Sequence, residues 1–385
     1  MGGTMIRHKA ARMRAGLGGL AVVVVLAACL LVPSASSAAG QPVFYELPPG
    51  THAHSMTAGP GGAIWFTGGQ ASTSGQGGSV VGSISNDGQV ELFPLPSHFF
   101  AGAITAGPDG NLWLAGAFHN KAGYLIPRIG RLSPGGALAE YAPANHVGTV
   151  HSVTAGPDGA IWFTLGYWVK GRKRPAVGRI DAGGATTLFP LPEGSGPGTI
   201  VAGSDGNLWF SERGGGAPRI GRITPDGRLT HFRLPSRYWR PTSIVAGADG
   251  NLWFGEEPVI FSPKGKSRVG RITTAGAIAE FRVPGRERTQ ALAAGPAGNV
   301  WFASPLGQGF LAVGSISSTG VVTPPACLKT TPCEVDADAL AVGADGQLWF
   351  SMSKYYSHRG GGGTGLWEGI TEASEAGFVG FFPAG

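Results

Sequence analysis

The chain has 385 residues, and its 67 glycines and 29 prolines make up about a quarter of it. Charged residues reach only 14%, against about 25% in typical domains, which argues against long helices with salt-bridged faces. Apolar residues reach 42% and include 10 Trp and 19 Phe, so the chain can bury a large core and is not disordered. This composition predicts short strands joined by glycine-rich turns.

The first 39 residues have the composition of a secretory signal peptide. Four basic residues precede an apolar run at 17–32, and small residues follow it up to Gly40. The run is shorter than the ~20 residues that a membrane-spanning helix needs, which argues against an anchor. Lipid attachment at Cys29 is the alternative to cleavage after Ala39. We therefore expect a secreted domain at 40–385, with no transmembrane helix after processing.

Removal of this segment changes the charge of the protein. The net charge falls from +6 to +2, because the segment carries four basic residues and no acidic residue. A nucleic-acid partner is therefore not expected. In an oxidising compartment Cys327 and Cys333 are expected to form one local disulfide, since two cysteines do not make a structural zinc site.

An internal repeat predicts the fold. Seven tryptophans recur at intervals of 44 to 49 residues, and each follows a similar turn and precedes an apolar residue: Trp65, Trp113, Trp162, Trp209, Trp253, Trp301 and Trp349. A period of this length with strand signals is typical of propeller blades. We expect these indole rings to pack between blades and not to bind a ligand.

One repeat shows four strands, at 199–202, 208–211, 219–224 and 228–234. Asp-Gly turns separate the first from the second and the third from the fourth. The sequence therefore predicts an all-β, seven-bladed β-propeller with four antiparallel strands per blade. Two terminal segments, 43–48 and 378–382, compete for the strand that closes the ring.

The repeats resemble those of the virginiamycin B lyase (streptogramin lyase) family. The resemblance rests on ITAGPDGNLW at 104–113 and RIGRLSPGG at 128–136, and on DGNLWFSE, IGRITPDG and FRLP within 205–235. It covers residues 43–385 and implies a seven-bladed propeller. It further implies a lyase that opens a cyclic depsipeptide antibiotic by magnesium-assisted elimination, which is an antibiotic-resistance activity. These motifs are mostly turns and core, so they are more specific for the fold than for the chemistry.

The residues that carry the chemistry in that family are not reproduced here. The family places its general base, a histidine, at the start of an innermost strand, and a second histidine at the same place in the next blade. By blade order these positions fall on Gln290 and Asp338, and the family's two glutamates fall on Asp336 and Met352. An amide cannot serve as a general base, and a thioether is a poor magnesium ligand. A glutamate after the core aromatic survives only as Glu212 and Glu256.

One face of the ring is expected to carry the function. The Asp-Gly turns define one face, so the loops from the second to the third strand emerge at the other. These loops vary most at 68–80, 165–176, 256–268 and 353–365. Eight histidines follow residue 39, and only His231 is expected in a strand. The other seven are expected on the variable face: His52, His54, His98, His119, His146, His151 and His358. Variable loops and histidines on one side favour a binding face.

The candidate site residues lie where the innermost strands begin. Seven equivalent positions are expected to converge on the axis: His54, Gly102, His151, Gly198, Thr242, Gln290 and Asp338. Five of them are polar, and the other two are glycine. If catalysis occurs, we assign it to His54, His151, Gln290 and Asp338. Ring closure would bring Asp336 and Asp338 near His54, which makes these three the candidate metal ligands. Ligand contacts are expected from Glu212, Glu256, Thr242, Tyr167, Trp168 and Tyr355.

The sequence supports two functions. The first is a monomeric, secreted or envelope-held propeller that binds a small molecule, a peptide or a glycan at its axial mouth. Basic and aromatic loops around Trp168 and Tyr355 suit such ligands. The alternative is a divergent carbon–oxygen lyase of the streptogramin type. Mg²⁺ is implied only by the resemblance, and no other cofactor is expected.

Overall fold

The computed structural model describes residues 43–70, 78–214, 216–259, 266–286, 289, 291–295, 298–307, 310–329, 334–355 and 377–382. These residues form strands and turns, with one short 3₁₀ turn, η1, at Pro60–Gly62. Among them, no helix is long and apolar enough to cross a membrane. The predicted signal segment and the predicted disulfide partner Cys333 lie outside the described residues.

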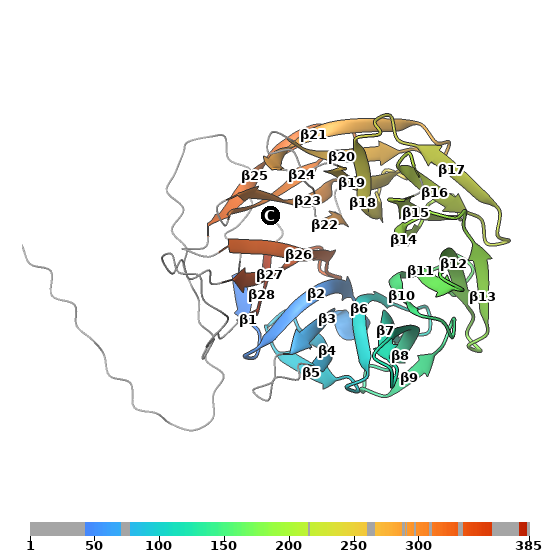
Figure 1. Ribbon diagram of the computed structural model, residues 1–385. Coiled ribbons are helices and arrows are strands. Elements are labelled where there is room, and N and C mark those ends of the chain that lie inside the picture. The colour runs from blue at the N-terminus through green and yellow to red at the C-terminus, as the bar shows by residue number, and fades with distance from the viewer. Residues whose placement is uncertain are drawn as a thin grey trace, which may run out of the picture.

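The described strands form seven antiparallel sheets of four strands, which are the seven predicted blades (Figure 1). Blades 1 to 3 consist of β2 (Thr51–Ala58), β3 (Ile64–Gln70), β4 (Gly78–Ile84) and β5 (Val90–Pro94); β6 (Phe99–Ala106), β7 (Leu112–His119), β8 (Leu125–Leu132) and β9 (Leu138–Tyr141); and β10 (Gly148–Ala155), β11 (Ile161–Val169), β12 (Arg172–Ile180) and β13 (Thr186–Pro190).

Blades 4 to 7 follow the same order, except that the last combines both ends of the chain. They consist of β14 (Pro197–Ala202), β15 (Leu208–Glu212), β16 (Arg219–Ile223) and β17 (Leu229–Arg233); β18 (Trp239–Ala246), β19 (Leu252–Pro258), β20 (Lys266–Ile272) and β21 (Ile278–Arg286); β22 (Ala291–Ala294), β23 (Val300–Gly307), β24 (Phe310–Ile316) and β25 (Val322–Lys329); and β26 (Glu334–Val342), β27 (Leu348–Tyr355), β28 (Gly377–Phe382) and β1 (Val43–Glu46).

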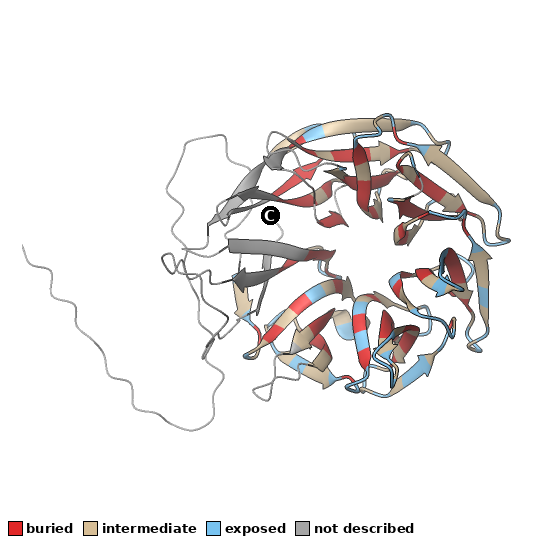
Figure 2. Cartoon of the chain, viewed as in Figure 1, coloured by how far each residue is buried: buried red, intermediate tan, exposed pale blue. Residues whose placement is uncertain are grey.

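The first strand of each blade lies next to the axis, and neighbouring blades meet through these strands. Contacts run from β2 through β6, β10, β14, β18 and β22 to β26, and β26 returns to β2. Figure 1 shows the resulting closed ring, and Figure 2 shows that its buried residues concentrate in the inner strands. Closure protects the sheet edges that an open array would expose.

The seven repeated tryptophans all lie in second strands, as predicted. Six of them are at least 96% buried, and Trp301 is partly buried. Trp65 of blade 1 packs against Phe99 and Leu112 of blade 2, which places the indole between blades. The prediction that these residues form the inter-blade core is therefore confirmed.

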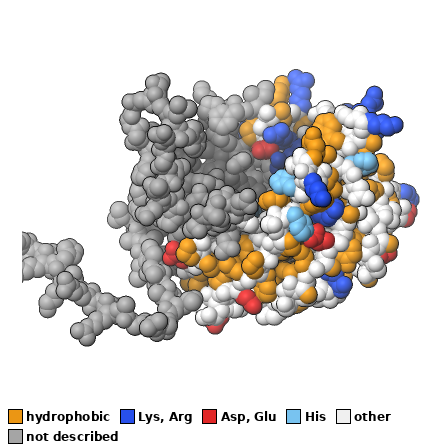
Figure 3. All heavy atoms as spheres, turned by 60° about the horizontal axis from the view of Figure 1, so that its bottom comes forward, with side chains coloured by type: hydrophobic (Ala, Val, Ile, Leu, Met, Phe, Trp, Pro, Cys, Tyr) orange, Lys and Arg blue, Asp and Glu red, His pale blue; other side chains and the backbone are white. Residues whose placement is uncertain are grey.

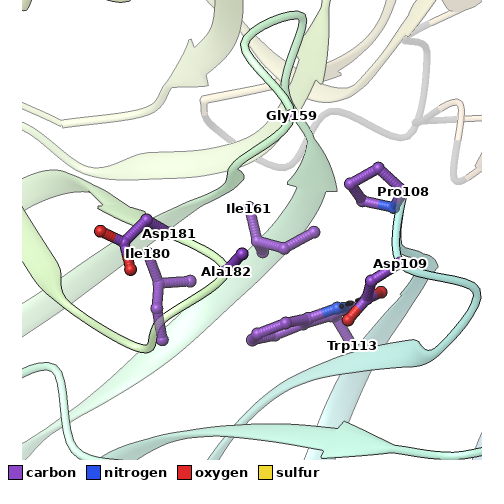
Figure 4. A pocket seen from close by; sticks show the side chains of 8 residues that line it. All are labelled: Pro108, Asp109, Trp113, Gly159, Ile161, Ile180, Asp181 and Ala182. Carbon is purple, nitrogen blue, oxygen red and sulfur yellow. Dashed lines mark hydrogen bonds between the residues drawn. The ribbon is translucent and has the colours of Figure 1, made fainter.

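The Asp-Gly turns have a second role, because their aspartates bind the tryptophans. Asp158 accepts a hydrogen bond from Trp162 Nε1 at 2.9 Å and one from Arg179 Nε at 2.6 Å. Burial alone would raise the pKa of the Asp158 carboxyl, but these hydrogen bonds outweigh it and lower the pKa. In blade 2, Asp109 binds Trp113 in the same way beside a shallow cleft between blades (Figure 4).

Both chain ends take part in closing the ring, at different positions. Strand β28 is the third strand of blade 7, and β1 pairs with it as the outermost strand. Tyr45 of β1 stacks on Trp349 with ring centroids 6.2 Å apart, as Phe93 of β5 stacks on Trp65 in blade 1. The two terminal segments therefore do not compete for one place.

Two sequence-based expectations about loops were wrong. His52, His54 and His151 lie within β2 and β10, and His119 ends β7, because these strands extend further toward the variable face than the repeat suggested. The expected loop at 165–176 is an ordered hairpin of β11 and β12 that pairs up to Val169 and Arg172. His231 lies in β17, as predicted.

Candidate functional site

The predicted site positions coincide with irregularities in the innermost strands. In β2, Ala53 and Ser55 pair with consecutive residues of β3, so His54 is an extra residue in the ladder. Gly102 in β6 and His151 in β10 occupy the same kind of bulge. The register also shifts at the equivalent place in β14, β18 and β26. Bulges re-aim side chains and are frequent beside functional sites.

Three consecutive blades expose their bulge residues to solvent. His54, Gly102 and His151 are exposed, although the residue before each of them is buried. The imidazole ring of His54 meets that of His52 edge to face, with centroids 4.6 Å apart. A Cβ on Gly102 would meet nothing closer than the Ala115 carbonyl oxygen at 3.9 Å, so this position leaves open space. At the axial end, blades 1 and 3 therefore present the imidazole rings of His54 and His151, and blade 2 leaves open space at Gly102.

The equivalent positions in blades 4 and 5 are more enclosed. Thr242 is only 5% exposed, and its hydroxyl donates to the Thr289 carbonyl oxygen of blade 6 at 2.9 Å. The Gly198 carbonyl oxygen accepts a hydrogen bond from Thr164 of blade 3 at 2.6 Å. These hydrogen bonds join neighbouring blades beside the axis. Thr242 thus contributes to ring closure in this structure.

His151 has an electropositive environment. Its Nδ1 lies 3.4 Å from the Thr149 hydroxyl, while Lys173 and Arg213 are close enough to act on its charge. Although His151 is exposed, the protein around it removes part of the water from its ring, and this desolvation, followed by repulsion from Lys173 and Arg213, lowers the pKa of the imidazole. The neutral imidazole is therefore favoured near pH 7, where it can accept a proton or a hydrogen bond. Figure 3 shows histidine, basic and acidic side chains gathered on one face.

Glu212 is fully buried and belongs to an ion-paired group inside blade 4. Its Oε2 lies 2.8 Å from His231 Nδ1 and 3.1 Å from Arg219 Nε. The three residues come from β15, β16 and β17, so the group crosses the outer three strands of the blade. The structure places Glu212 toward these partners, and its role in ligand binding stays a prediction.

Glu256 holds the same position in blade 5 with a different partner set. Its neighbours in β20 and β21 are Arg268 and Glu280, which are equivalent to Arg219 and His231 of blade 4. Arg268 Nη1 binds Glu280 Oε2 at 2.9 Å, and neither Glu256 oxygen has a hydrogen-bond partner in the described structure. Burial, reinforced by the Glu280 charge, raises the pKa of Glu256 to about 8. Arg268 thus lies beside two carboxyl groups and pairs with the partly buried Glu280, not with the fully buried Glu256.

Several predicted site residues lie wholly or partly outside the described part of the chain. Gln290 and His358 lie outside the described residues. Asp336 and Asp338 lie in β26 and Tyr355 ends β27, but only their backbone is described. The register shift in β26 includes Asp338, as the repeat requires. Tyr167 and Trp168 lie in β11, where Tyr167 stacks on His146 and Trp168 is 49% exposed.

The described residues do not fit a magnesium site. Among them, no group of three or more His, Cys, Asp or Glu could hold a metal ion. Glu212 is paired with Arg219 and His231, and Glu256 lies beside Arg268. The resemblance implies that Met352 stands where the family has a metal-binding glutamate. No catalytic step is therefore assigned to a metal.

Sequence reasoning missed three charged residues of these clusters: Arg219, Arg268 and Glu280. Lys173 was expected only as part of the basic and aromatic loop around Trp168. A signal was present for the two arginines, because the repeat RIGRI or RVGRI places an arginine opposite each glutamate. The roles of Glu280 and Lys173 depend on cross-strand and cross-blade neighbours, which a single repeat does not reveal.

The fold and the bulges together define a seven-bladed propeller with polar side chains at one end of its axis. Comparison with known proteins then identifies the family: the virginiamycin B lyase family profile matches residues 127–356, and the chain belongs to that family. A search of curated proteins found no match.

Two solved structures show the same architecture. A streptogramin B lyase is 26% identical, with a TM-score of 0.63, and the match covers 88% of this chain and 98% of that one. A catalytically inactive histidine-to-alanine variant of virginiamycin B lyase from Staphylococcus aureus, solved with quinupristin, is 27% identical, with a TM-score of 0.63. That match covers 88% of this chain and 99% of the other.

Proposed function

We propose that this protein captures a small molecule, a peptide or a glycan at the axial opening on the side of the innermost-strand bulges. The observation that carries the proposal is the exposure of His54, Gly102 and His151 at equivalent bulges of three consecutive blades. A bulge disrupts the hydrogen bonds between strands. Because it recurs at the same position in these three blades, a functional role for the bulge residues is favoured. These residues are held by paired strands of the propeller, so little conformational entropy is lost when a ligand binds.

The histidines themselves provide the test. A mixture of small molecules, peptides and oligosaccharides is added to the purified domain at 40–385, and the imidazole NMR signals are followed. We expect ligands to shift the His54 and His151 signals and to leave that of His231 unchanged, because His231 lies in an outer strand bound to Glu212. Ligands that bind without shifting either His54 or His151 would contradict the proposal.

A second candidate function is the elimination reaction of the family, which membership favours. The departures at Gln290 and Met352 argue against it, since the base and a metal ligand of the family pattern are replaced. Incubation with quinupristin and Mg²⁺, followed by mass spectrometry of the linear product, separates the two functions. We expect no ring opening above the protein-free control. Turnover of many ring-opened molecules per protein would favour the lyase.

We further propose that the domain works outside the cytoplasm, either secreted or held at the cell envelope. The basic start, the apolar run and the small residues before Gly40 support this location. The intact mass of the protein recovered from the producing cells tests it. A chain starting at Gly40 agrees with secretion, and a lipid on Cys29 agrees with the envelope-held form. Retention of residues 1–39 without modification would contradict both.

A further inference from the structure

Blade 3 carries a hairpin that extends beyond its sheet on the side of the bulges. Strands β11 and β12 have nine residues each, whereas β15 and β16 of blade 4 have five. Lys170 and Gly171 form the two-residue turn with φ values of 48° and 75°, which suits a type I′ turn. Pairing continues to Val169 and Arg172, so the extension is an ordered platform.

The two faces of this hairpin carry different chemistry. The Thr164 hydroxyl donates to Gly198 of blade 4, so the face of Thr164 is turned toward that blade. Strand alternation puts Gly166 and Trp168 on the same face, and Lys173 joins them as the cross-strand partner of Trp168. Tyr167 and its partner Arg174 point to the opposite face, where Tyr167 stacks on His146.

Gly166 allows a cation and an imidazole to meet on the face toward blade 4. A Cβ at this position would lie 2.9 Å from Lys173 Cε and 3.2 Å from His151 Nε2. The lysine chain therefore passes over Gly166 toward the His151 ring, in space that any larger residue would fill. Trp168 stands beside them with half of its surface open to solvent.

The positive charge at this place is only partly balanced by the protein. In the described part of the chain, no carboxylate forms an ion pair with Lys173 or His151. Arg213 adds to the positive charge near His151, although its own contacts are with blade 5: Nε donates to the Pro241 carbonyl oxygen at 3.2 Å, and Nη1 lies 3.5 Å from Glu257 Oε1. Lys173 and Arg213 also disfavour the protonated form of His151, which is the expected consequence of gathered positive charge.

We propose that His151, Trp168 and Lys173, here named the blade-3 platform, bind the carboxylate or phosphate group of a small ligand. A ring or other flat apolar part of the ligand lies on Trp168, next to the anionic group. An anion relieves the repulsion among the cations and accepts hydrogen bonds from the lysine ammonium and the protonated imidazole. The inference rests on the proposed function, because it names the ligand class for the same axial opening.

Phenyl phosphate is a suitable probe, because it joins an aromatic ring to an anionic group. Inorganic phosphate and phenol, which each represent one of these parts, are the comparison ligands. Binding is measured by the imidazole signals of His151 in an NMR titration repeated across pH 5 to 8. We expect phenyl phosphate to bind more tightly than either comparison ligand and to raise the pKa of His151, since a bound anion stabilises the imidazolium.

The matched variants are Lys173→Gln and Arg174→Gln, which remove one charge each from opposite faces of the same hairpin. We expect Lys173→Gln to weaken phenyl phosphate binding at least tenfold and Arg174→Gln to weaken it less than twofold. Trp168→Ala is expected to weaken binding of phenyl phosphate while leaving that of inorganic phosphate nearly unchanged. Equal losses in the Lys173 and Arg174 variants would show unspecific attraction and overturn the proposal.

The outcome also separates this inference from the function on which it rests. If other ligands shift His54 or His151 while phenyl phosphate and phosphate do not, the ligand class is wrong and the opening is still a binding site. If no ligand of any class shifts either histidine, both proposals fail. An unchanged His151 pKa on saturation with phenyl phosphate would overturn the blade-3 platform alone.

Discussion

Replacement of Glu256 by glutamine is expected to make the propeller more stable in alkaline solution and to flatten its dependence on pH. Burial and the Glu280 charge raise the pKa of Glu256 from an ordinary value of 4.5 to about 8 in the folded protein. The folded state therefore binds a proton that the unfolded state releases between these two values. The stability that this proton provides is fully present below about pH 4.5 and is lost as the pH rises through about 8.

The expected effect is large, because each unit of pKa difference corresponds to about 1.4 kcal/mol. In the wild type, about 4 kcal/mol of unfolding free energy is expected to be lost between pH 5 and pH 9. Urea unfolding at several pH values measures it. The Glu256→Gln variant should match the wild type at pH 5 and exceed it at pH 9. Parallel curves for the two proteins would contradict the assignment of the proton to Glu256.

Glu280→His provides a sharper control for the same prediction. It gives blade 5 the partner set of blade 4, in which Glu212 binds both an arginine and a histidine. With the second carboxylate removed, Arg268 becomes available to Glu256, and the loss of stability toward high pH should shrink. A variant that keeps the full pH dependence would show that Glu280 is not part of its cause.

The reverse result is expected for Glu212, although it occupies the same position one blade earlier. Its carboxylate is fully buried, is ion-paired with Arg219 and lies within hydrogen-bond distance of His231. Glu212→Gln removes the negative charge and leaves the guanidinium without its partner, which typically costs about 3–5 kcal/mol. We expect this loss in the unfolding free energy at pH 7, measured by urea denaturation.

An exposed histidine–glutamate contact in blade 2 serves as the control for this prediction. His98 Nε2 lies 3.0 Å from Glu140 Oε1, but the side chains are 51% and 26% exposed. Glu140→Gln should therefore cost less than about 1 kcal/mol, because water screens such pairs. If the Glu212 and Glu140 variants lose equal stability, burial does not control the strength of these pairs.

The architecture could be predicted from the sequence because its signals lie in short segments of the chain. Five of the seven tryptophans follow an Asp-Gly turn, and in blades 2 to 5 the turn aspartate binds the indole four residues later, so one short segment contains both partners. In the repeat taken as the example, 219–224 was interpreted as an alternating third strand, and an Asp-Gly turn separates it from the fourth. Because seven copies repeat the same local signals, the number of blades and the place of Trp65 to Trp349 followed from spacing alone.

The site was harder to predict from the sequence, because it depends on pairing between strands. The positions of His54, Gly102 and His151 were found as repeat equivalents, but the sequence does not show that each is an extra residue in its ladder. Whether a residue bulges depends on the register of the neighbouring strand. The long segment at 165–176 read as a loop, since its pairing up to Val169 and Arg172 follows from a two-residue turn at its tip.

The sequence by itself thus determined the class of fold and the repeat unit, and the resemblance predicts that Gln290 and Met352 replace the family's base and metal ligand. Only the tertiary structure decided that Glu212 is paired while Glu256 is not, because the deciding residues, His231 and Glu280, lie two strands away. It also brought Lys173 to His151 across Gly166. Turn and strand preferences act between near neighbours in the chain, whereas charge and burial act through space, between residues that only the closed ring brings together.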